Sequence, residues 1–309
     1  MLVVSRECKG YKTSAQLQTA GIYPICASLD RLVKVISYFI LSYDMAIDYK
    51  EFRDLSAIII ALAFGFAYKF AGPATLSNWS ANFILILVLV AISILVHEFA
   101  HKIVARKFGA DVKPQIWLSG IIIMLLVMVL TNGFIIFAAI WAVSIIPIRL
   151  FRPGRTSIHT GPQERSVIAM SGLLANLGLA VVAKLLFPVL GDVALKLMTI
   201  NLTIALFNLV PFFTLLPMLA LQRMKQRAIE APYVEGEYIF FGSRTGWVFL
   251  FVFSAVLTAS LFFLGAIVSV ALALILAVML WIAWHYFFEA ESIKDVKMTS
   301  PSFRSYKKI

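Results

Sequence analysis

Long apolar runs, rather than alternating or amphipathic patterns, dominate this sequence. A helix needs about 20 largely apolar residues to cross a bilayer, so these runs predict transmembrane helices. The last two runs join into one stretch that is too long for a single crossing, and we expect a turn near Gly265. The candidate segments are 55–72, 83–105, 116–131, 167–190, 197–221, 246–264 and 265–288.

The third segment differs from the others, because it is short and runs into a second apolar stretch at 133–148. That stretch is rich in Ile, Val and Phe and is punctuated by Gly133 and Pro147. The pattern predicts a short helix followed by strands, in a membrane-associated β-hairpin region that leaves and re-enters the membrane on one side. The predicted fold is an all-α membrane protein, a polytopic helical bundle of about six transmembrane helices with that hairpin region.

Composition excludes a soluble protein: 61% of the 309 residues are hydrophobic, 14% are charged, and the mean hydropathy is +0.92. The formal net charge of +11 does not indicate nucleic-acid binding, because 24 of the 27 Lys and Arg residues lie at the termini or in every second loop, on one side of the predicted spans. Cations collect on the cytoplasmic side of membrane proteins. The distribution therefore predicts a multi-pass protein of the cell membrane, in contact with the lipid bilayer, with both termini in the cytoplasm.

Three regions follow from this topology. Residues 1–54 are expected to form a cytoplasmic N-terminal extension, in which the short apolar stretch 31–43 predicts an interfacial helix. Residues 55–288 form the transmembrane domain, and residues 289–309 a basic cytoplasmic tail. No internal repeat is visible.

One acidic residue, Glu98, lies inside an apolar span, where an ionisable group is costly and indicates a functional site. His97 and His101 flank it four residues apart, so both imidazoles lie on one helix face and can bind one metal ion. This is the HExxH pattern of zinc metalloproteases, in which the two His residues bind Zn2+ and the Glu is the general base. A chance match is the alternative, but the nearly all apolar residues 83–96 before the motif disfavour it.

The sequence resembles the site-2 protease family of intramembrane zinc metalloproteases, in its compact archaeal or bacterial form. The resemblance is carried by VHEFAHKIVARKFGA (96–110), SGLLAN (171–176) and ALFNLVP (205–211). It implies a metalloendopeptidase that cuts within or near the transmembrane segments of membrane-protein substrates. It also implies that strands near 133–148 offer an edge to which the unwound substrate adds a strand.

The sequence departs from the family at the third metal ligand, because Leu216 stands where the family has Asp, and Pro217 where it has Gly. A catalytic zinc normally has three protein ligands. Either another residue completes the site, or the metal binds weakly and the chain is a non-proteolytic scaffold or regulator that binds transmembrane helices. A transporter or proton channel is a weaker alternative. The substitutes, which the sequence does not rank, are Asp111, His159, Glu230, Glu235 and Glu237.

Asn208 keeps its family position, and the resemblance implies that it holds the substrate backbone or the oxyanion. An interhelical hydrogen bond is an equal alternative. Asn176 is expected to pack between helices rather than to act chemically. His285, close to Trp281 and Trp284, is expected to belong to an interfacial aromatic belt.

Overall fold

The structure is a computed structural model that describes residues 48–69, 76–147, 160–211 and 233–289. The predicted interfacial helix at 31–43 and the basic tail from 290 onwards lie outside the described residues.

The predicted helical membrane bundle is confirmed. Five helices in the described part of the chain are long and apolar enough to cross a membrane. They are α5 (Leu76–Lys107), α7 (Pro162–Leu190), α8 (Asp192–Leu209), α11 (Arg244–Phe263) and α12 (Ala266–Trp284). The remaining predicted span, 55–72, corresponds to α4 (Tyr49–Lys69). The first two turns of α4 carry several charged side chains. The predicted turn near Gly265 separates α11 from α12.

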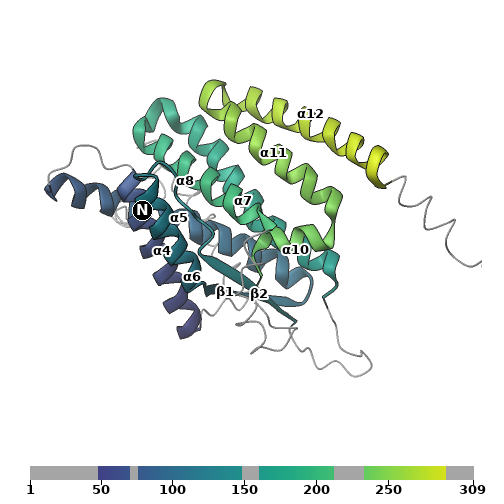
Figure 1. The fold of residues 1–309 in the computed structure, drawn as a ribbon, viewed down its shortest axis with the longest axis horizontal. Helices are drawn as coiled ribbons and strands as arrows, with labels where there is room; N and C mark the ends of the chain where they lie inside the picture. The colour runs from purple at the N-terminus through teal and green to yellow at the C-terminus, as the bar shows by residue number, and fades with distance from the viewer. Residues whose placement is uncertain (1–47, 70–75, 148–159, 212–232, 290–309) are drawn as a thin grey trace, which may run out of the picture. The chain divides into compact units, whose positions relative to one another are not determined.

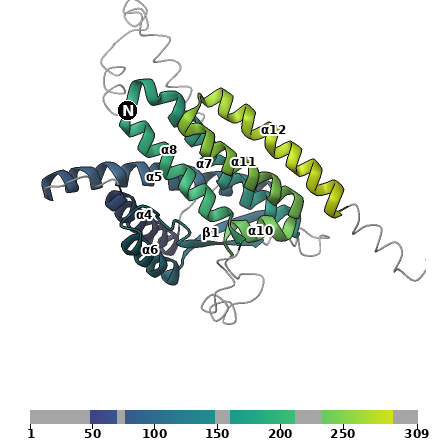
Figure 2. The same cartoon turned by 45° about the horizontal axis from the view of Figure 1, so that its top comes forward.

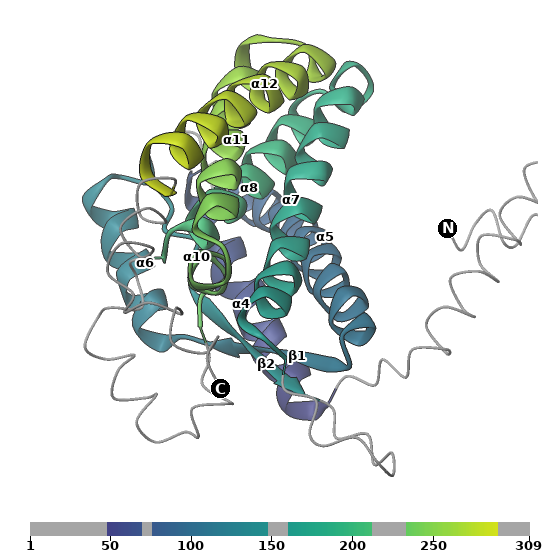
Figure 3. The same ribbon diagram turned by 90° about the vertical axis from the view of Figure 1, so that its right-hand side faces the viewer.

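Helix α7 is central to the packing, since it contacts α5, α8 and the short helix α10 (Glu235–Gly242). Helices α11 and α12 run side by side along one side of the bundle (Figure 1). The two strands and α4 lie on the side away from α12, which the turned views also show (Figures 2 and 3). Helix α10 contacts both α7 and α8, and the sheet contacts α4 and α5 through its first strand.

The sheet has two antiparallel strands, β1 (Ala110–Ile116) and β2 (Trp141–Pro147), with Ala110 opposite Pro147 and Ile116 opposite Trp141. The prediction that both strands lie within 133–148 is wrong, since residues 133–140 form no strand and β1 lies earlier in the chain, before the short helix predicted at 116–131. Lys113 and Gln115 made this stretch resemble a loop, although its buried positions alternate as in a half-buried strand. Helix α6 (Leu118–Leu130) connects the two strands, as the short helix predicted there.

Helix α8 begins five residues earlier than predicted and ends at Leu209. Only Gly191, with a positive φ of 51°, separates it from α7, and glycine adopts this conformation without steric cost. This end lies two residues before Pro211, and proline disfavours continuation of a helix, whereas Pro217 lies outside the described residues. The C-terminal end of α8 thus stops beside α10.

A buried ion pair joins α5 to α4. The ammonium group of Lys102 contacts the carboxylate of Glu51, and both residues are buried. Lys102 lies in the charged last part of α5, yet its charge is enclosed between two helices. Because both charges are removed from water, each depends on the other.

We expect Lys102→Met to destabilise the protein by about 3–5 kcal/mol, because it leaves the Glu51 carboxylate buried without its partner. Denaturant unfolding in detergent micelles measures the change. The double variant Lys102→Met/Glu51→Leu should recover most of the loss. A single variant as stable as the parent protein would show that the pair contributes nothing.

Candidate metal centre

The two histidines of the motif lie on the buried face of α5. His97 and His101 have no exposed surface, and their Nε2 atoms are 3.1 Å apart. The helical spacing of four residues brings the rings together, with their centroids 4.6 Å apart and their planes nearly perpendicular. Two ring nitrogens at this distance can share one cation or one proton.

A third side chain joins them from a distant part of the sequence. The Oε1 atom of Glu235, the first residue of α10, lies 2.8 Å from His97 Nε2 and 3.4 Å from His101 Nε2. In the described part of the chain, these three buried residues form the one group of His, Cys, Asp and Glu side chains that could hold a metal ion. One of the unranked substitutes for the third ligand therefore stands next to the histidines.

The other substitutes are elsewhere. Asp111 is on β1, with its carboxylate 3.6 Å from the guanidinium of Arg106. Glu237 is buried two residues beyond Glu235 and lines a separate pocket. Three further positions lie outside the described residues, namely His159, Glu230 and Leu216.

Close packing of α10 against the end of α8, at Gly236, determines the position of the neighbouring Glu235. A Cβ atom on Gly236 would lie 2.2 Å from the carbonyl oxygen of Leu209, so only glycine lets α10 come this close to the end of α8. The Nδ2 group of Asn208 donates a hydrogen bond of 3.2 Å to Glu235 Oε1. In the structure Asn208 therefore bonds the candidate ligand itself and links α8 to α10.

The surroundings of His101 fix which nitrogen faces Glu235. Its Nδ1 lies 2.8 Å from the carbonyl oxygen of Ile168, which can only accept a hydrogen bond, so Nδ1 carries a proton and Nε2 is the nitrogen that faces His97 and Glu235. Metal-binding histidines commonly donate their second nitrogen in this way. On the other side, a Cβ atom on Gly172 would lie 2.3 Å from His101 Nε2. The glycine of the SGLLAN segment therefore gives the imidazole its space.

Charge inside the site favours an ionised Glu235. Burial alone would raise the pKa of its carboxyl group, but the adjacent imidazoles of His97 and His101 outweigh it and lower the pKa to about 2. Glu98 is also buried, within electrostatic range of both imidazoles, and neither of its carboxylate oxygens has a hydrogen-bond partner among the described residues. The second oxygen of Glu235 also has none there. Buried carboxylates without partners are costly and indicate a role beyond packing.

The donor atoms fit a zinc ion. With Zn–N distances of about 2.0–2.1 Å, tetrahedral ligands lie about 3.3 Å apart. The three separations here are 2.8, 3.1 and 3.4 Å. Two imidazoles and a carboxylate are also the ligand set of several catalytic zinc sites.

The remaining singled-out residues lie apart from this group. Asn176 is fully buried within α7, where it packs inside the bundle. The ring of His285, just beyond α12, stacks on Trp281 with centroids 6.2 Å apart.

Sequence analysis did not single out Glu235, because 137 residues separate it from His97 and no motif connects them. The local signal was the adjacent Gly236 in a short apolar segment, which marks a place where the backbone can approach another element closely. The contact of Gly172 with His101 was likewise not predicted from the sequence.

The fold and this group define a helical membrane protein with a buried site that could bind a metal ion. The chain is 31% identical over 172 residues to a protein of Methanocaldococcus jannaschii named "Putative zinc metalloprotease MJ0611", covering 52% of this chain and 78% of that protein. No family model matches the sequence, and no solved structure matches it. With this identity and coverage, the chain belongs to the same zinc metalloprotease family as that relative.

We expect Gly172→Ala to weaken metal binding by about 10–100-fold, the loss typical when the surroundings of a ligand are disturbed, because the added methyl group displaces the His101 ring. Zinc per chain, measured after dialysis against buffers of fixed free zinc, tests this. Gly178→Ala on the same helix is the matched control, since its Cβ meets nothing within 4 Å. Equal zinc affinity of the two variants would contradict the role of Gly172.

Proposed function

We propose that this protein is an intramembrane zinc metalloendopeptidase of the site-2 type, which hydrolyses peptide bonds in or near the transmembrane helices of membrane-protein substrates. The observation that carries the proposal is the position of Glu235 beside His97 and His101. It supplies a third ligand in place of the family's aspartate, whose position is Leu216 here.

Each residue of the site takes one role. His97, His101 and Glu235 would hold the zinc ion, which supplies Lewis-acid polarisation of the scissile carbonyl when bound. Glu98 accepts the proton of the attacking water and then donates it to the leaving amine. Asn208, which donates to Glu235, keeps the carboxylate oriented toward the histidines.

The depth of the site supports cleavage inside the membrane. The part of α5 long and apolar enough to cross a membrane is Trp79–Lys107, and His97 lies ten residues before its charged end. At 1.5 Å per residue, the site is about 15 Å inside that end of the helix. With both termini in the cytoplasm, as the loop charges predict, this end faces the cytoplasm and water enters from there.

The alternative of a non-proteolytic scaffold rested on the absence of a third ligand at position 216. Glu235 offers a ligand from a different element, so this reason for the alternative no longer applies. No observation in the described part of the chain favours it over hydrolysis.

We expect Glu235→Gln to lower zinc affinity by at least tenfold, because changes in even the outer shell of a metal site commonly cost about 10–100-fold. Metal analysis of the purified full chain provides the measurement. Glu237→Gln is the matched control, since that carboxylate is not in the group with the histidines. Undiminished zinc in Glu235→Gln would remove this residue from the ligand set.

We expect Glu98→Gln to lower cleavage by about 10²–10⁴-fold, the usual contribution of a general acid-base group, while zinc per chain stays unchanged. The assay uses liposomes that contain the protein and a transmembrane reporter helix with a tag at each end. Cleavage that persists in this variant would exclude Glu98 as the general base. Absence of cleavage in the parent protein, with zinc bound, would count against the proposed function as a whole.

A further inference from the structure

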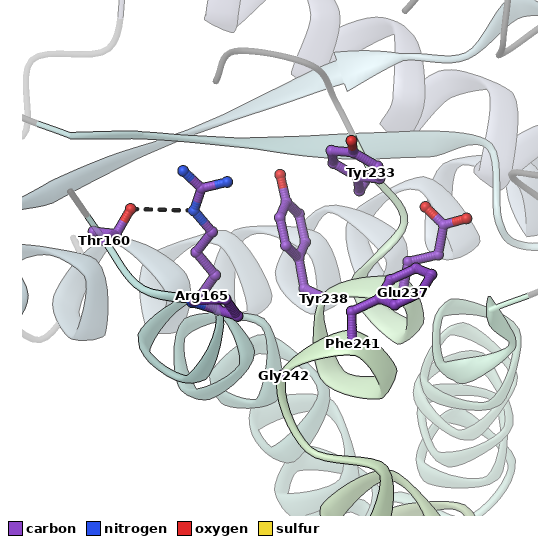
Figure 4. A pocket seen from close by; sticks show the side chains of 8 residues that line it. Thr160, Arg165, Tyr233, Glu237, Tyr238, Phe241 and Gly242 are labelled. Carbon is purple, nitrogen blue, oxygen red and sulfur yellow. Dashed lines mark hydrogen bonds between the residues drawn. The ribbon is translucent and has the colours of Figure 1, made fainter. Parts of the chain in front are cut away.

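A second feature of the described residues lies beside the candidate metal centre. A pocket of about 570 Å³ is lined by α10, by Tyr233 two residues before it, and by the start of α7 with Thr160 just before that helix. Figure 4 shows its main side chains: Thr160, Arg165, Tyr233, Glu237, Tyr238 and Phe241. None of these residues belongs to the metal-binding group.

Two residues that line the pocket form hydrogen bonds with the outer edge of β2. Val143 and Tyr233 exchange two backbone hydrogen bonds of 2.9 and 3.1 Å, and the hydroxyl of Tyr238 donates to the carbonyl oxygen of Val143 at 3.1 Å. Burial raises the pKa of the Tyr238 phenol, so the hydroxyl stays protonated and remains a donor. The edge that was predicted to receive a substrate strand is therefore paired at Val143 with the chain's own segment.

The pocket lies close to the metal-binding group, so a bound peptide would pass from one to the other within a few residues. Trp141, two residues before Val143 on β2, packs edge-on against His97 with ring centroids 5.7 Å apart. Two residues of extended chain span about 7 Å. On α10, Tyr238 lies three residues after Glu235, or about 4.5 Å along the helix. A peptide cut at the metal would thus reach the pocket with a residue about two to four positions from the scissile bond.

The accessible charge in this pocket is positive. Arg165 is partly exposed, and its Nε donates a hydrogen bond of 3.2 Å to Thr160 Oγ1. Among the described residues no carboxylate lies within ion-pair distance of its guanidinium, which points toward the sheet beside the Tyr238 hydroxyl (Figure 4). Glu164 instead accepts a hydrogen bond from the Gly161 backbone.

The opposite wall of the pocket carries a negative charge. Glu237 is buried there, whereas the ring of Phe241 is 72% exposed. An anionic group is therefore attracted to the Arg165 end, and its methylene groups can lie against the exposed ring. A guanidinium that has no carboxylate partner among the described residues can donate two parallel hydrogen bonds to a carboxylate.

We infer that this pocket binds a carboxylate of the substrate, with Arg165 as its anchor, and so selects peptides that carry an acidic group a few residues from the cut. This inference rests on the proposed function, because it assigns the pocket to the peptide that the metal site would cleave. The carboxylate is either an Asp or Glu side chain or the C-terminus of a shortened substrate.

The test measures peptide binding to the full-length Glu98→Gln protein in detergent, so that it does not depend on cleavage. Short peptides of Ala, Ser and Gly are immobilised through an N-terminal biotin. One has a central Asp and an amidated C-terminus, a second has Asn in its place, and a third is neutral with a free C-terminal carboxylate. We expect the Asp peptide to bind about tenfold more tightly than the Asn peptide. Tight binding of the third peptide would identify the C-terminus as a carboxylate source.

Variants of Arg165 decide the assignment. Arg165→Gln should remove the preference for Asp, and Arg165→Glu should reverse it in favour of a peptide with a central Lys, which a merely misfolded variant cannot do. Arg244→Gln is the matched control, because Arg244 is exposed and does not line the pocket. Equal binding of the Asp and Asn peptides, no binding of either, or an equal loss in Arg244→Gln would overturn the inference. Failure of the proposed function shows instead as missing reporter cleavage, independently of these affinities.

Discussion

The contact between His97 and Glu235 is the interaction on which the rest of the structure depends. It joins α5, in the first part of the described chain, to α10, in the last part, across 2.8 Å inside a helical bundle. A carboxylate with 1% of its side chain exposed cannot remain ionised there without positive or hydrogen-bonding partners. The two imidazoles and the Asn208 amide supply those partners, so the fold has to bring three separate helices to one point.

Two glycines make this convergence possible. Without side chains at Gly172 and Gly236, α7 can reach the His101 ring and α10 can reach the end of α8. In both places the missing Cβ atom would overlap a group of the site or of its support. Polar residues inside a membrane bundle are tolerated only where other parts of the protein satisfy them, and close approach of the helices provides this.

The sequence predicted the local features of the fold well, because apolar length and helical spacing are local properties. The bundle, the turn at Gly265 and the end of α8 before Pro211 follow from such patterns. The first strand was missed because Lys113 and Gln115, which face away from its buried side, resembled a basic loop. The sequence could propose His97 and His101 as a pair from one motif. It could only name Glu235 among five substitutes, since its position depends on tertiary packing at Gly236.

The eight residues of α10 connect the two sites of the molecule. The helix presents Glu235 to the histidines, and it presents Glu237 and Tyr238 to the neighbouring pocket. Its start is held on one side by the end of α8 and on the other by the Val143–Tyr233 pair on β2. A short helix fixed at several points connects these contacts rigidly. Under the proposed function, a peptide that bound at the strand edge in place of Tyr233 would therefore also affect the position of Glu235.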